Sequence, residues 1–373
     1  MTAPPSIALP GSDQRVLWRS DDAPPPADRI ELAGDQTTAQ EALRRLRSRW
    51  LIYRGDYKNA RQLLAAVGRR LGARRDTAKT PLELFRAERQ SRQQEHDTLS
   101  RLLVELNAAG GLSLRAAPAV AEACRWRWGP ELGPSVVPLR ELQGVLGAYE
   151  WYRKGLEVAG LPGRLHPHYG VFTPTRGAYP ELLRAVPDPT GKLVFDVGTG
   201  TGVLAFLLLA RGAARAVATD VDPAAVASAR EDAASLGFGS RFEVREVDLF
   251  PEGRADIVVC NPPWLPEAVR GRLDAAVFDP DSRFLLRFLA ELPAHLAPAG
   301  VGYLLISNLA ELLGLRPPDF LSSEIARAGL EVVWRKEAPA SHPRSQDAGD
   351  KLHAVRSREV VTLYGLAASV SRV

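Results

Sequence analysis

The chain has 373 residues, of which 45% are hydrophobic and 25% charged, a balance that is ordinary for a soluble globular protein. Its longest apolar run, residues 203–210, is too short to span a bilayer, and the N-terminus shows no secretory signal pattern. Two cysteines, Cys124 and Cys260, exclude a disulfide framework, and no Cys/His spacing resembles a zinc site. We therefore expect a soluble cytoplasmic protein without a metal site, long enough for a catalytic domain and an accessory domain.

The net charge of +4 is distributed unevenly. Residues 1–165 carry 26 Lys and Arg against 19 Asp and Glu, whereas residues 166–373 carry 22 against 25. Within the first part, residues 44–75 hold 11 basic side chains and one acid, Asp56. Such a basic patch favours a nucleic-acid or protein partner. The alternative is a solvated helix surface in a chain that uses arginine freely.

The first part of the chain carries mostly helical patterns. Residues 1–27 contain six prolines and no apolar periodicity, which predicts a mobile arm. From about residue 38 the apolar residues recur at helical spacing, and Thr80-Pro81-Leu82-Glu83 has the pattern of a capped helix start. The expected apolar faces include Leu43, Leu46, Trp50, Ala60, Leu63, Leu64, Val67, Leu71, Leu99, Leu102, Leu103 and Leu106. With further helices expected near 117–127 and 138–157, residues 28–165 are predicted to form an all-helical domain for substrate recognition or as a lid.

Strand and helix patterns alternate after a connector that ends near residue 170, as in a parallel sheet with helices on both faces. Strands are predicted at 194–197, 216–219, 242–247, 257–260 and 301–306, and helices at 202–211, 223–236, 282–297 and 319–328. The last two strands, 330–334 and 360–364, are separated by the polar stretch 337–357, for which no helix is predicted. This suggests an antiparallel pair at the end of the sheet. Residues 166–373 are therefore predicted to form a Rossmann-like, doubly wound α/β domain with an antiparallel last strand.

A glycine-rich turn follows the first predicted strand. The strand contains Asp196 and runs into Gly198-Thr199-Gly200-Thr201-Gly202, which opens a helix. Glycines let the backbone approach a ligand closely, and a helix N-terminus offers free N–H groups to an anionic group. A phosphate-binding loop would require Gly-Lys-Ser/Thr at its end, where Val203 stands, and a nicotinamide site prefers G-x-G-x-x-G. The turn therefore favours an S-adenosylmethionine site, with a tight turn that binds no ligand as the alternative.

Two aspartates follow the next strands and complete the predicted cofactor site. Asp220 ends the second strand, at a position where a carboxylate accepts hydrogen bonds from ribose hydroxyls. Asp248 lies just past the third strand, where the exocyclic amine of an adenine can donate to it. Val221 and Leu249, the residues that follow these acids, belong to the same predicted site. The alternative for Asp220 is a helix cap, and the alternative for Asp248 is the closure of a turn.

The segment Asn261-Pro262-Pro263-Trp264 follows the fourth strand, so we expect it at the carboxyl edge of the sheet beside the cofactor. Together with Asp-Val-Gly-Thr-Gly-Thr-Gly at 196–202, it resembles the amino-methyltransferases of the class I fold. That group includes HemK-type release-factor glutamine methyltransferases and the adenine-amino and small-domain rRNA guanine-amino methyltransferases. The resemblance covers about residues 166–373 and implies S-adenosylmethionine-dependent methylation of a nitrogen. It also implies that a segment before the first strand closes over the cofactor, which makes Phe172 and Arg176 expected pocket residues.

The predicted catalytic residues are Asn261, Pro262, Pro263 and Trp264. The nitrogen of an amide or an exocyclic amine is a poor nucleophile because its lone pair is delocalised. The side-chain oxygen of Asn261 and the carbonyl of Pro262 can accept its two hydrogens and orient it for attack. The prolines stiffen the loop, and Trp264 is expected to stack on the flat acceptor.

The acceptor stays open between a protein glutamine and an amino group on rRNA, tRNA or DNA. A small-molecule N-methyltransferase, in which the helical domain is a lid, is the second hypothesis. A non-catalytic scaffold or a nicotinamide oxidoreductase is less favoured. A scaffold does not need the hydrogen-bond acceptors of Asn261-Pro262, and no proton donor for an oxidoreductase is visible near the cofactor turn.

Overall fold

The computed structural model describes residues 4–11, 14–27, 29–72, 80–172, 178–340 and 343–369 of the chain. The chain forms two compact units. Residues 1–78 and 86–150 make the N-terminal unit, and residues 79–85 and 151–373 make the C-terminal unit. The division falls after Glu150 rather than after residue 165. The reason is that Tyr152 and His168 both bind Glu231, a helical residue of the C-terminal unit.

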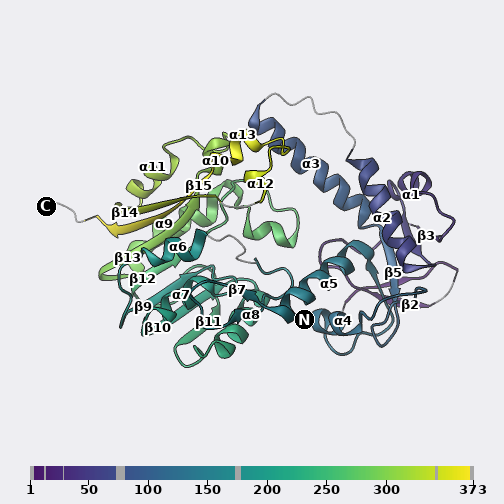
Figure 1. The fold of residues 1–373 in the computed structure, drawn as a ribbon, viewed down its shortest axis with the longest axis horizontal. Coiled ribbons are helices and arrows are strands. Elements are labelled where there is room, and N and C mark those ends of the chain that lie inside the picture. Colours follow the sequence, from purple (N-terminus) through teal and green to yellow (C-terminus); the bar gives the residue numbers. More distant parts are fainter. Residues whose placement is uncertain are drawn as a thin grey trace. The chain divides into compact units, whose positions relative to one another are not determined.

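The C-terminal unit is built on a seven-stranded sheet with the order β11-β10-β9-β12-β13-β15-β14 (Figure 1). Its strands are β9 (Leu193–Val197), β10 (Arg215–Asp220), β11 (Phe242–Glu246), β12 (Ala255–Cys260), β13 (Leu296–Ser307), β14 (Leu330–Pro339) and β15 (Val360–Ala368). Strands β9 to β13 are parallel, and β15 runs antiparallel to both of its neighbours, β13 and β14. The predicted Rossmann-like sheet with an antiparallel last strand is confirmed.

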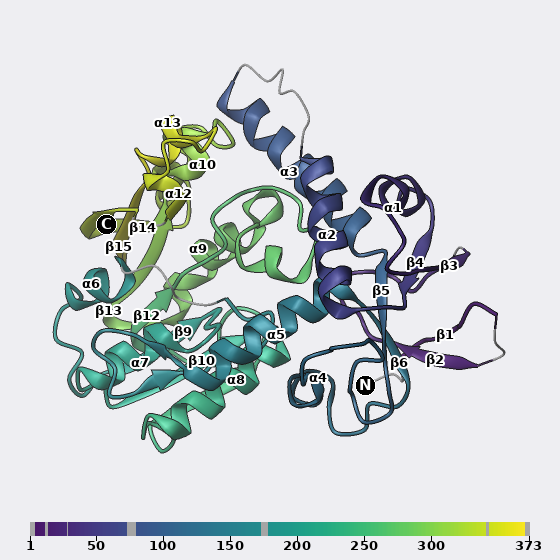
Figure 2. The same ribbon diagram turned by 45° about the vertical axis from the view of Figure 1, so that its right-hand side comes forward.

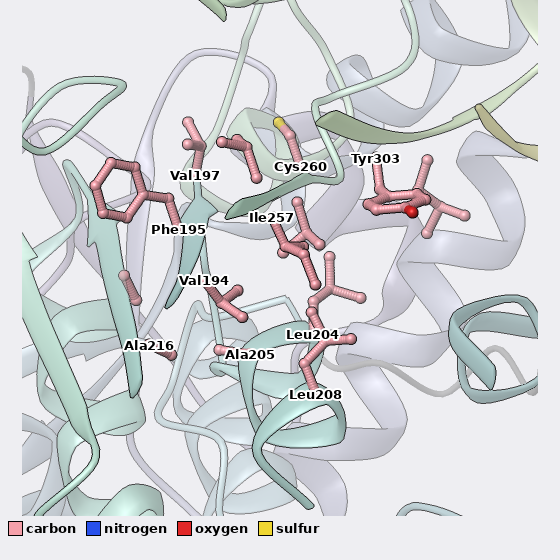
Figure 3. Packing of buried hydrophobic residues seen from close by; sticks show 14 of the residues in the cluster. Val194, Phe195, Val197, Leu204, Ala205, Leu208, Ala216, Ile257, Cys260 and Tyr303 are labelled. Carbon is pink, nitrogen blue, oxygen red and sulfur yellow. The ribbon is translucent and has the colours of Figure 1, made fainter. Parts of the chain in front are cut away.

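Helices and short elements connect these strands. They are β7 (Leu156–Glu157), β8 (Arg164–Leu165), α6 (Ala178–Arg184), α7 (Val203–Ala210), α8 (Pro223–Ser235), η1 (Arg272–Ala276), η2 (Pro280–Ser282), α9 (Arg283–His295), α10 (Leu309–Leu312) and α11 (Phe320–Arg327). Helix α7 is entirely apolar, and all its residues except the last are buried. Figure 3 shows Leu204 and Leu208 of α7 in one core with Val194 of β9 and Ile257 of β12. Burial of this helix against the sheet fixes the place where the glycine-rich turn must run.

The strand order reverses between β9 and β12. The chain places β10 and β11 on one side of β9 and then crosses to β12 and β13 on the other side. In open parallel sheets, the crevice outside the carboxyl ends at such a reversal is where ligands bind. The reversal therefore brings the turn after β9 and Asn261, which follows β12, to the same part of the sheet edge.

The polar stretch 337–357 contains two short helices, α12 (Pro343–Gln346) and α13 (His353–Arg356), so the prediction of a stretch without helix is wrong. The carboxylate of Asp350 fixes this region, because it accepts the backbone N–H of Leu352 (2.7 Å) and pairs with Arg344 (3.0 Å) and Arg356. Leu352 is buried. A helix of four residues is too short to produce an apolar period in the sequence.

The N-terminal unit has a six-stranded mixed sheet with the order β1-β2-β6-β5-β4-β3 (Figure 2). Its elements are β1 (Ser6–Ala8), β2 (Arg15–Trp18), β3 (Ile30–Ala33), α1 (Ala39–Leu46), β4 (Trp50–Tyr53), α2 (Tyr57–Leu71), α3 (Pro81–Leu99), β5 (Leu102–Leu106), α4 (Ala121–Trp128), β6 (Ser135–Pro138) and α5 (Leu139–Lys154). The first turn of α3 and the last turn of α5 belong to the C-terminal unit. The prediction of an all-helical domain is therefore wrong, although its helices exist.

Short apolar runs account for this error. All four residues of β4 are buried, as are all four residues of β6. A run of four or five apolar residues that is buried on both faces has no period by which a strand differs from a helix. Trp50, Leu102, Leu103 and Leu106 therefore lie on strands β4 and β5 and not on the predicted helices.

Residues 4–27 do not form the predicted mobile arm. Strand β1 pairs antiparallel with β2, and β2 pairs in parallel with β6. Ile7, Val16 and Trp18 are buried, and the indole N–H of Trp18 donates to the carbonyl of Ala23 (3.1 Å). Strands of three and four residues between prolines are too short for their alternation of buried and exposed residues to stand out in the sequence.

The helix start predicted at Thr80 is confirmed. The hydroxyl of Thr80 accepts the backbone N–H of Glu83 (3.2 Å), and the carboxylate of Glu83 accepts the backbone N–H of Thr80 (3.0 Å). This reciprocal pair satisfies two backbone donors at the start of α3.

Among the helices of the described ranges, none combines the length and the apolar character needed to cross a membrane.

Candidate active site

A pocket with an empty volume of about 1120 Å³ opens at the carboxyl ends of β9, β10, β11 and β12, where the strand order reverses. Most of the predicted site residues line it: Phe172, Gly198, Thr199, Gly200, Thr201, Asp220, Val221, Asp248, Leu249, Asn261 and Pro263. These residues come from five separate segments of the sequence, and the parallel strand ends bring them together.

Five predicted residues do not line the pocket. Asp196, Gly202, Pro262 and Trp264 lie behind its wall, and Asp196, Pro262 and Trp264 are buried. Arg176 lies outside the described residues. Gly202, Pro262 and Trp264 each follow a lining residue in sequence, and Asp196 lies two residues before the lining residue Gly198, so these four residues stand directly behind the lining.

Asp196 shapes the glycine-rich turn from below. Its Oδ2 accepts the hydroxyl of Thr199 (2.7 Å) and the backbone N–H of Ala205 (3.1 Å). Its Oδ1 is buried without a hydrogen-bond partner among the described residues. Burial raises the pKa of Asp196 to about 6, although the two hydrogen bonds oppose this shift. Asp196 therefore orders the turn and the start of α7.

Two glycines of the turn have different roles. Gly202 precedes α7 with φ of +82°, and a Cβ there would lie 2.5 Å from the ring of Phe206, so glycine allows the helix to pack. Gly200 has φ of +55°, and a Cβ there would meet nothing within 4 Å. The turn thus leaves open space at Gly200, beside the free N–H groups at the start of α7.

Asp220 presents a fixed carboxylate to the pocket. Its Oδ2 accepts the backbone N–H of Gly200 (2.9 Å), and its Oδ1 accepts the backbone N–H of Asp222 (2.9 Å). Burial raises the pKa of Asp220, and these two hydrogen bonds oppose the shift. Because a carboxylate has about four lone-pair sites, each oxygen keeps an acceptor site for a ligand. The arrangement suits a pair of neighbouring hydroxyls.

Apolar side chains stand beside Asp220. Val221 is 64% exposed and Val247 is 39% exposed, and both line the pocket. Leu249 has φ of +58° and is buried, and its carbonyl accepts the buried hydroxyl of Thr219. Asp248, which was predicted to meet an adenine amine, pairs with Arg287 (2.7 Å) at the pocket rim. A contact of Asp248 with adenine would therefore share the carboxylate with this arginine.

The segment at 261–264 presents Asn261 to the pocket and turns Trp264 inward. The indole N–H of Trp264 donates to Oδ1 of Asn261 (3.0 Å) and to the carbonyl of Leu305 (3.3 Å). Trp264 is only 8% exposed. Its indole therefore positions Asn261, and the structure does not place its ring on the pocket surface, where stacking on an acceptor was predicted.

The sequence analysis missed several lining residues, among them Ala275, Ala276 and Phe284. Phe284 is fixed by Asp279, whose carboxylate accepts the backbone N–H groups of Phe284 (2.9 Å) and Leu285 (3.0 Å). The sequence does carry a signal here, because Asp279-Pro280 before an apolar period is the pattern of a helix start. It did not show that this start faces the glycine-rich turn, since that contact depends on the position of α9.

The segment before β9 also reaches the pocket, as predicted. Gly170, Val171 and Phe172 line it. Two residues earlier, Nε2 of His168 contacts a carboxylate oxygen of Glu231 on α8 (2.8 Å). The hydroxyl of Tyr152 donates to the other oxygen of Glu231 (2.6 Å). These contacts tie one pocket wall to the helix whose first turn forms another.

The pocket fits S-adenosylmethionine. Asp220 would hold the ribose hydroxyls, Val221 and Val247 would flank the adenine, and the turn at Gly200 would receive the methionine portion. The observation that supports this fit is the open space at Gly200 beside the fixed carboxylate of Asp220. No group of three or more potential metal ligands occurs within the described part of the chain.

Known proteins resemble this chain in the same region. The family model of ribosomal protein L11 methyltransferase matches residues 181–262. A protein of Methanocaldococcus jannaschii, named as a protein N5-glutamine methyltransferase, is 34% identical over 162 residues, which are 41% of this chain and 80% of that protein. The release factor glutamine methyltransferase of Cereibacter sphaeroides is 42% identical over 134 residues, which are 32% of this chain and 48% of that enzyme.

Among solved structures, a methyltransferase of Thiobacillus denitrificans in complex with S-adenosyl-L-homocysteine is similar over 53% of this chain and 92% of that chain. The sequence identity is 16% and the TM-score is 0.36.

Taken with the pocket, the sequence relatives place the chain among the class I S-adenosylmethionine-dependent methyltransferases, and S-adenosylmethionine is its cofactor. Within this class, one relative is matched over 80% of its length at 34% identity. The chain therefore belongs to the HemK-like family of protein N5-glutamine methyltransferases. It spans about half of the length of the Cereibacter enzyme.

Proposed function

We propose that the enzyme methylates the side-chain amide nitrogen of a glutamine in a protein of the translation machinery. The relatives support the class of acceptor, since their names specify glutamine, a release factor and ribosomal protein L11. The observation that carries the proposal is the position of Asn261, whose side-chain oxygen is held at the pocket by the indole of Trp264.

The orientation of the Asn261 amide follows from its partner. An indole N–H can only donate a hydrogen bond, so the atom that it contacts must be the oxygen and not the nitrogen of the amide. One lone pair of Oδ1 is used by Trp264 (3.0 Å), and the second is available to a substrate. The structure thus supports Asn261 as a hydrogen-bond acceptor of fixed direction.

These acceptors address the chemical difficulty of an amide nucleophile. The lone pair of the nitrogen is delocalised into the carbonyl, so the nitrogen must be oriented and its developing positive charge stabilised. In the proposal, Oδ1 of Asn261 and the carbonyl of Pro262 accept its two hydrogens. S-adenosylmethionine supplies a methyl group that is activated for transfer to this nitrogen. No general base is required, because the methylated nitrogen is acidic enough to release its proton to water.

The substitution Asn261→Ala tests this arrangement. It removes the side-chain acceptor and leaves the cofactor residues in place, so we expect transfer to fall by about a hundredfold while the affinity for S-adenosylmethionine stays unchanged. Transfer is measured with labelled cofactor and a cell extract, followed by protease or ribonuclease treatment and by mass spectrometry of the labelled peptides. Cofactor affinity is measured by isothermal titration calorimetry.

The acceptor is identified by the fate of the label. A methyl group on a glutamine side chain, lost when Asn261→Ala replaces the wild type, is the expected result. Label that ribonuclease releases would indicate that the acceptor is an amino group on an RNA base and not a glutamine. Label found only in small molecules would favour the small-molecule hypothesis. Full transfer by Asn261→Ala would contradict the role of this residue for every acceptor.

A further inference from the structure

A groove of about 1290 Å³ crosses the N-terminal unit between α2, α3 and the start of α5. Its walls carry Lys58, Arg61 and Arg69 from α2, Arg140 from α5, and the acid Glu95 from α3. We propose that this α2 groove binds the phosphate backbone of RNA. The methyltransferase would thereby hold a protein substrate that is itself bound to RNA. This link to the substrate and the choice of RNA over DNA rest on the proposed function.

The first argument is the absence of acids along α2. The helix has four basic residues, Lys58, Arg61, Arg69 and Arg70, and no acidic residue. Within the described ranges, none of these four side chains forms an ion pair. The single acid of the groove, Glu95, is already paired with Arg140 (3.6 Å). Among the described residues, the basic side chains of α2 therefore have no acidic partner.

The remaining basic residues of the 44–75 patch provide a contrast. Arg45 and Arg49 both pair with Glu31 of β3, and Arg54 pairs with Glu105 of β5 (2.9 Å). These arginines balance acids within the sheet and serve the fold. The tertiary structure thus pairs Arg45, Arg49 and Arg54 of the basic patch with acids, whereas the basic residues of α2, like Arg44 and Arg47, form no ion pair among the described residues.

The second argument is the geometry of α2. Each of the positions 58, 61, 62, 65 and 69 lies three or four residues from another member of this set, which places them on one stripe of the helix. The stripe from Lys58 to Arg69 extends about 16 Å at a rise of 1.5 Å per residue. The guanidinium of Arg61 lies over the ring of Tyr57, 5.8 Å from its centroid, which restrains this side chain at the surface. A straight row of donors suits the repeated phosphates of a nucleic-acid strand.

The chemistry of the groove favours a nucleic acid over an acidic protein. Leu64 and Leu99 line it but are buried. Apart from the carboxylate of Glu95, which pairs with Arg140, the accessible polar groups are guanidinium, ammonium and amide groups such as those of Gln62 and Gln143. Energetically important positions of protein interfaces are enriched in Trp and Tyr as well as Arg, and no aromatic side chain is among the described residues that line this groove. Arginine matches phosphate with two parallel hydrogen bonds. RNA is the nucleic acid that surrounds proteins of the translation machinery, so we commit to RNA.

The test uses the full-length protein and a fluorescein-labelled RNA hairpin in fluorescence anisotropy titrations. The groove variant is Arg61→Glu with Arg69→Glu. The matched control is Arg44→Glu with Arg47→Glu, which makes the same change of charge at two exposed arginines of α1 and its C-terminal cap. We expect the groove variant to bind the hairpin at least about tenfold more weakly at the same salt concentration. The slope of log affinity against log salt should also become shallower by about 1.4 to 1.8, while the control stays near the wild type.

Three results would overturn the proposal. One is an equal loss in the groove and control variants, which would indicate unspecific attraction by net charge. Another is displacement of the hairpin by polyglutamate as effectively as by unlabelled RNA, which would identify an acidic protein as the partner. The third is unchanged binding in a groove variant that keeps its thermal unfolding midpoint. Because no methyl transfer is measured, failure of this proposal is separate from failure of the glutamine assignment, which Asn261→Ala tests.

Discussion

Each unit has parallel strands with an aspartate at the carboxyl edge, but the two edges differ in what the aspartate meets. In the N-terminal unit, β3 and β4 are parallel, and Asp35 follows β3. Asp35 accepts the hydroxyl of Tyr53 (2.7 Å), the backbone N–H of Asp56 (3.0 Å) and the amide of Asn59 (3.0 Å), and it pairs with Arg115. This edge is closed by its own side chains.

The C-terminal edge is open. Asp220 at the end of β10 accepts two backbone N–H groups and faces the pocket. The glycines show the same difference. A Cβ on Gly55 would lie 2.6 Å from Oδ1 of Asp35, whereas a Cβ on Gly200 would meet nothing within 4 Å. An aspartate at a sheet edge thus becomes a ligand site only where the backbone turn leaves space in front of it.

The largest expected effect comes from exchanging the two aspartates for alanine. Asp220→Ala should weaken the binding of S-adenosylmethionine by about tenfold to a hundredfold, because hydrogen bonds to a charged acceptor are lost. Asp35→Ala should leave this affinity unchanged and lower the thermal unfolding midpoint. Calorimetric titration with the cofactor and thermal melts measure the two effects. If both variants weaken cofactor binding equally, the proposed difference between the open edge at Asp220 and the closed edge at Asp35 is contradicted.

The second prediction rests on opposite pKa shifts at the two edges. Hydrogen bonds from the backbone of Asp56 and the side chains of Tyr53 and Asn59 lower the pKa of Asp35. Burial raises the pKa of Asp196, beneath the open edge, to about 6. Stabilisation by Asp35 is present above its unfolded pKa of about 4 and is lost as the pH falls below that value. The contribution of Asp196 is complete below about pH 4 and is lost as the pH rises through about 6.

The substitution Asp196→Asn isolates the second of these contributions. Asparagine imitates the protonated carboxyl, so the variant should be more stable than the wild type at pH 7, by on the order of 2 kcal/mol, and the difference should shrink at pH 5. The measurement compares the free energies of unfolding of both proteins by denaturant titration at the two pH values. A difference that does not change with pH would show that Asp196 keeps an ordinary pKa.

The smallest expected effect concerns Trp264. At the open edge this residue performs the holding function that Tyr53 performs for Asp35 at the closed edge. Trp264→Phe keeps an aromatic ring in the core and removes one N–H donor, which is worth about 1 kcal/mol. We expect kcat to fall by about fivefold with unchanged cofactor affinity. A raised KM for the protein substrate with normal kcat would instead indicate the stacking contact that the sequence predicted.

The sequence predicted the C-terminal unit well because its signals are local. The alternation of strands and helices, the turn from Gly198 to Gly202 and the acid at Asp220 all follow directly from residue order, and the structure confirms the sheet and the shared pocket. The sequence predicted the positions of these residues along the chain more accurately than the directions of their side chains. Asp196 and Trp264 belong to the site, but both point into the core. Whether a side chain faces a pocket or the core is decided by the elements that cover it, and the sequence does not record these.

The sequence failed for the N-terminal unit for a related reason. Buried runs such as Trp50–Tyr53 become strands only because β3 and β5, distant in sequence, supply hydrogen-bond partners on both sides. A run of four residues has too few positions to distinguish a strand from a helix. The two short helices near Asp350 were missed because they are likewise too short to show a period.

By itself, the sequence predicted which segments meet at the candidate site, since the glycine-rich turn, Asp220 and Asn261 each follow a strand that ends at one sheet edge. Only the tertiary structure decided which carboxylates stay open to a ligand, which way the indole of Trp264 donates, and which arginines in the described part of the basic patch pair with an acid. These properties depend on partners far away in the chain. Residue spacing determines local backbone geometry, whereas burial and charge pairing arise from contacts that form when distant segments pack together.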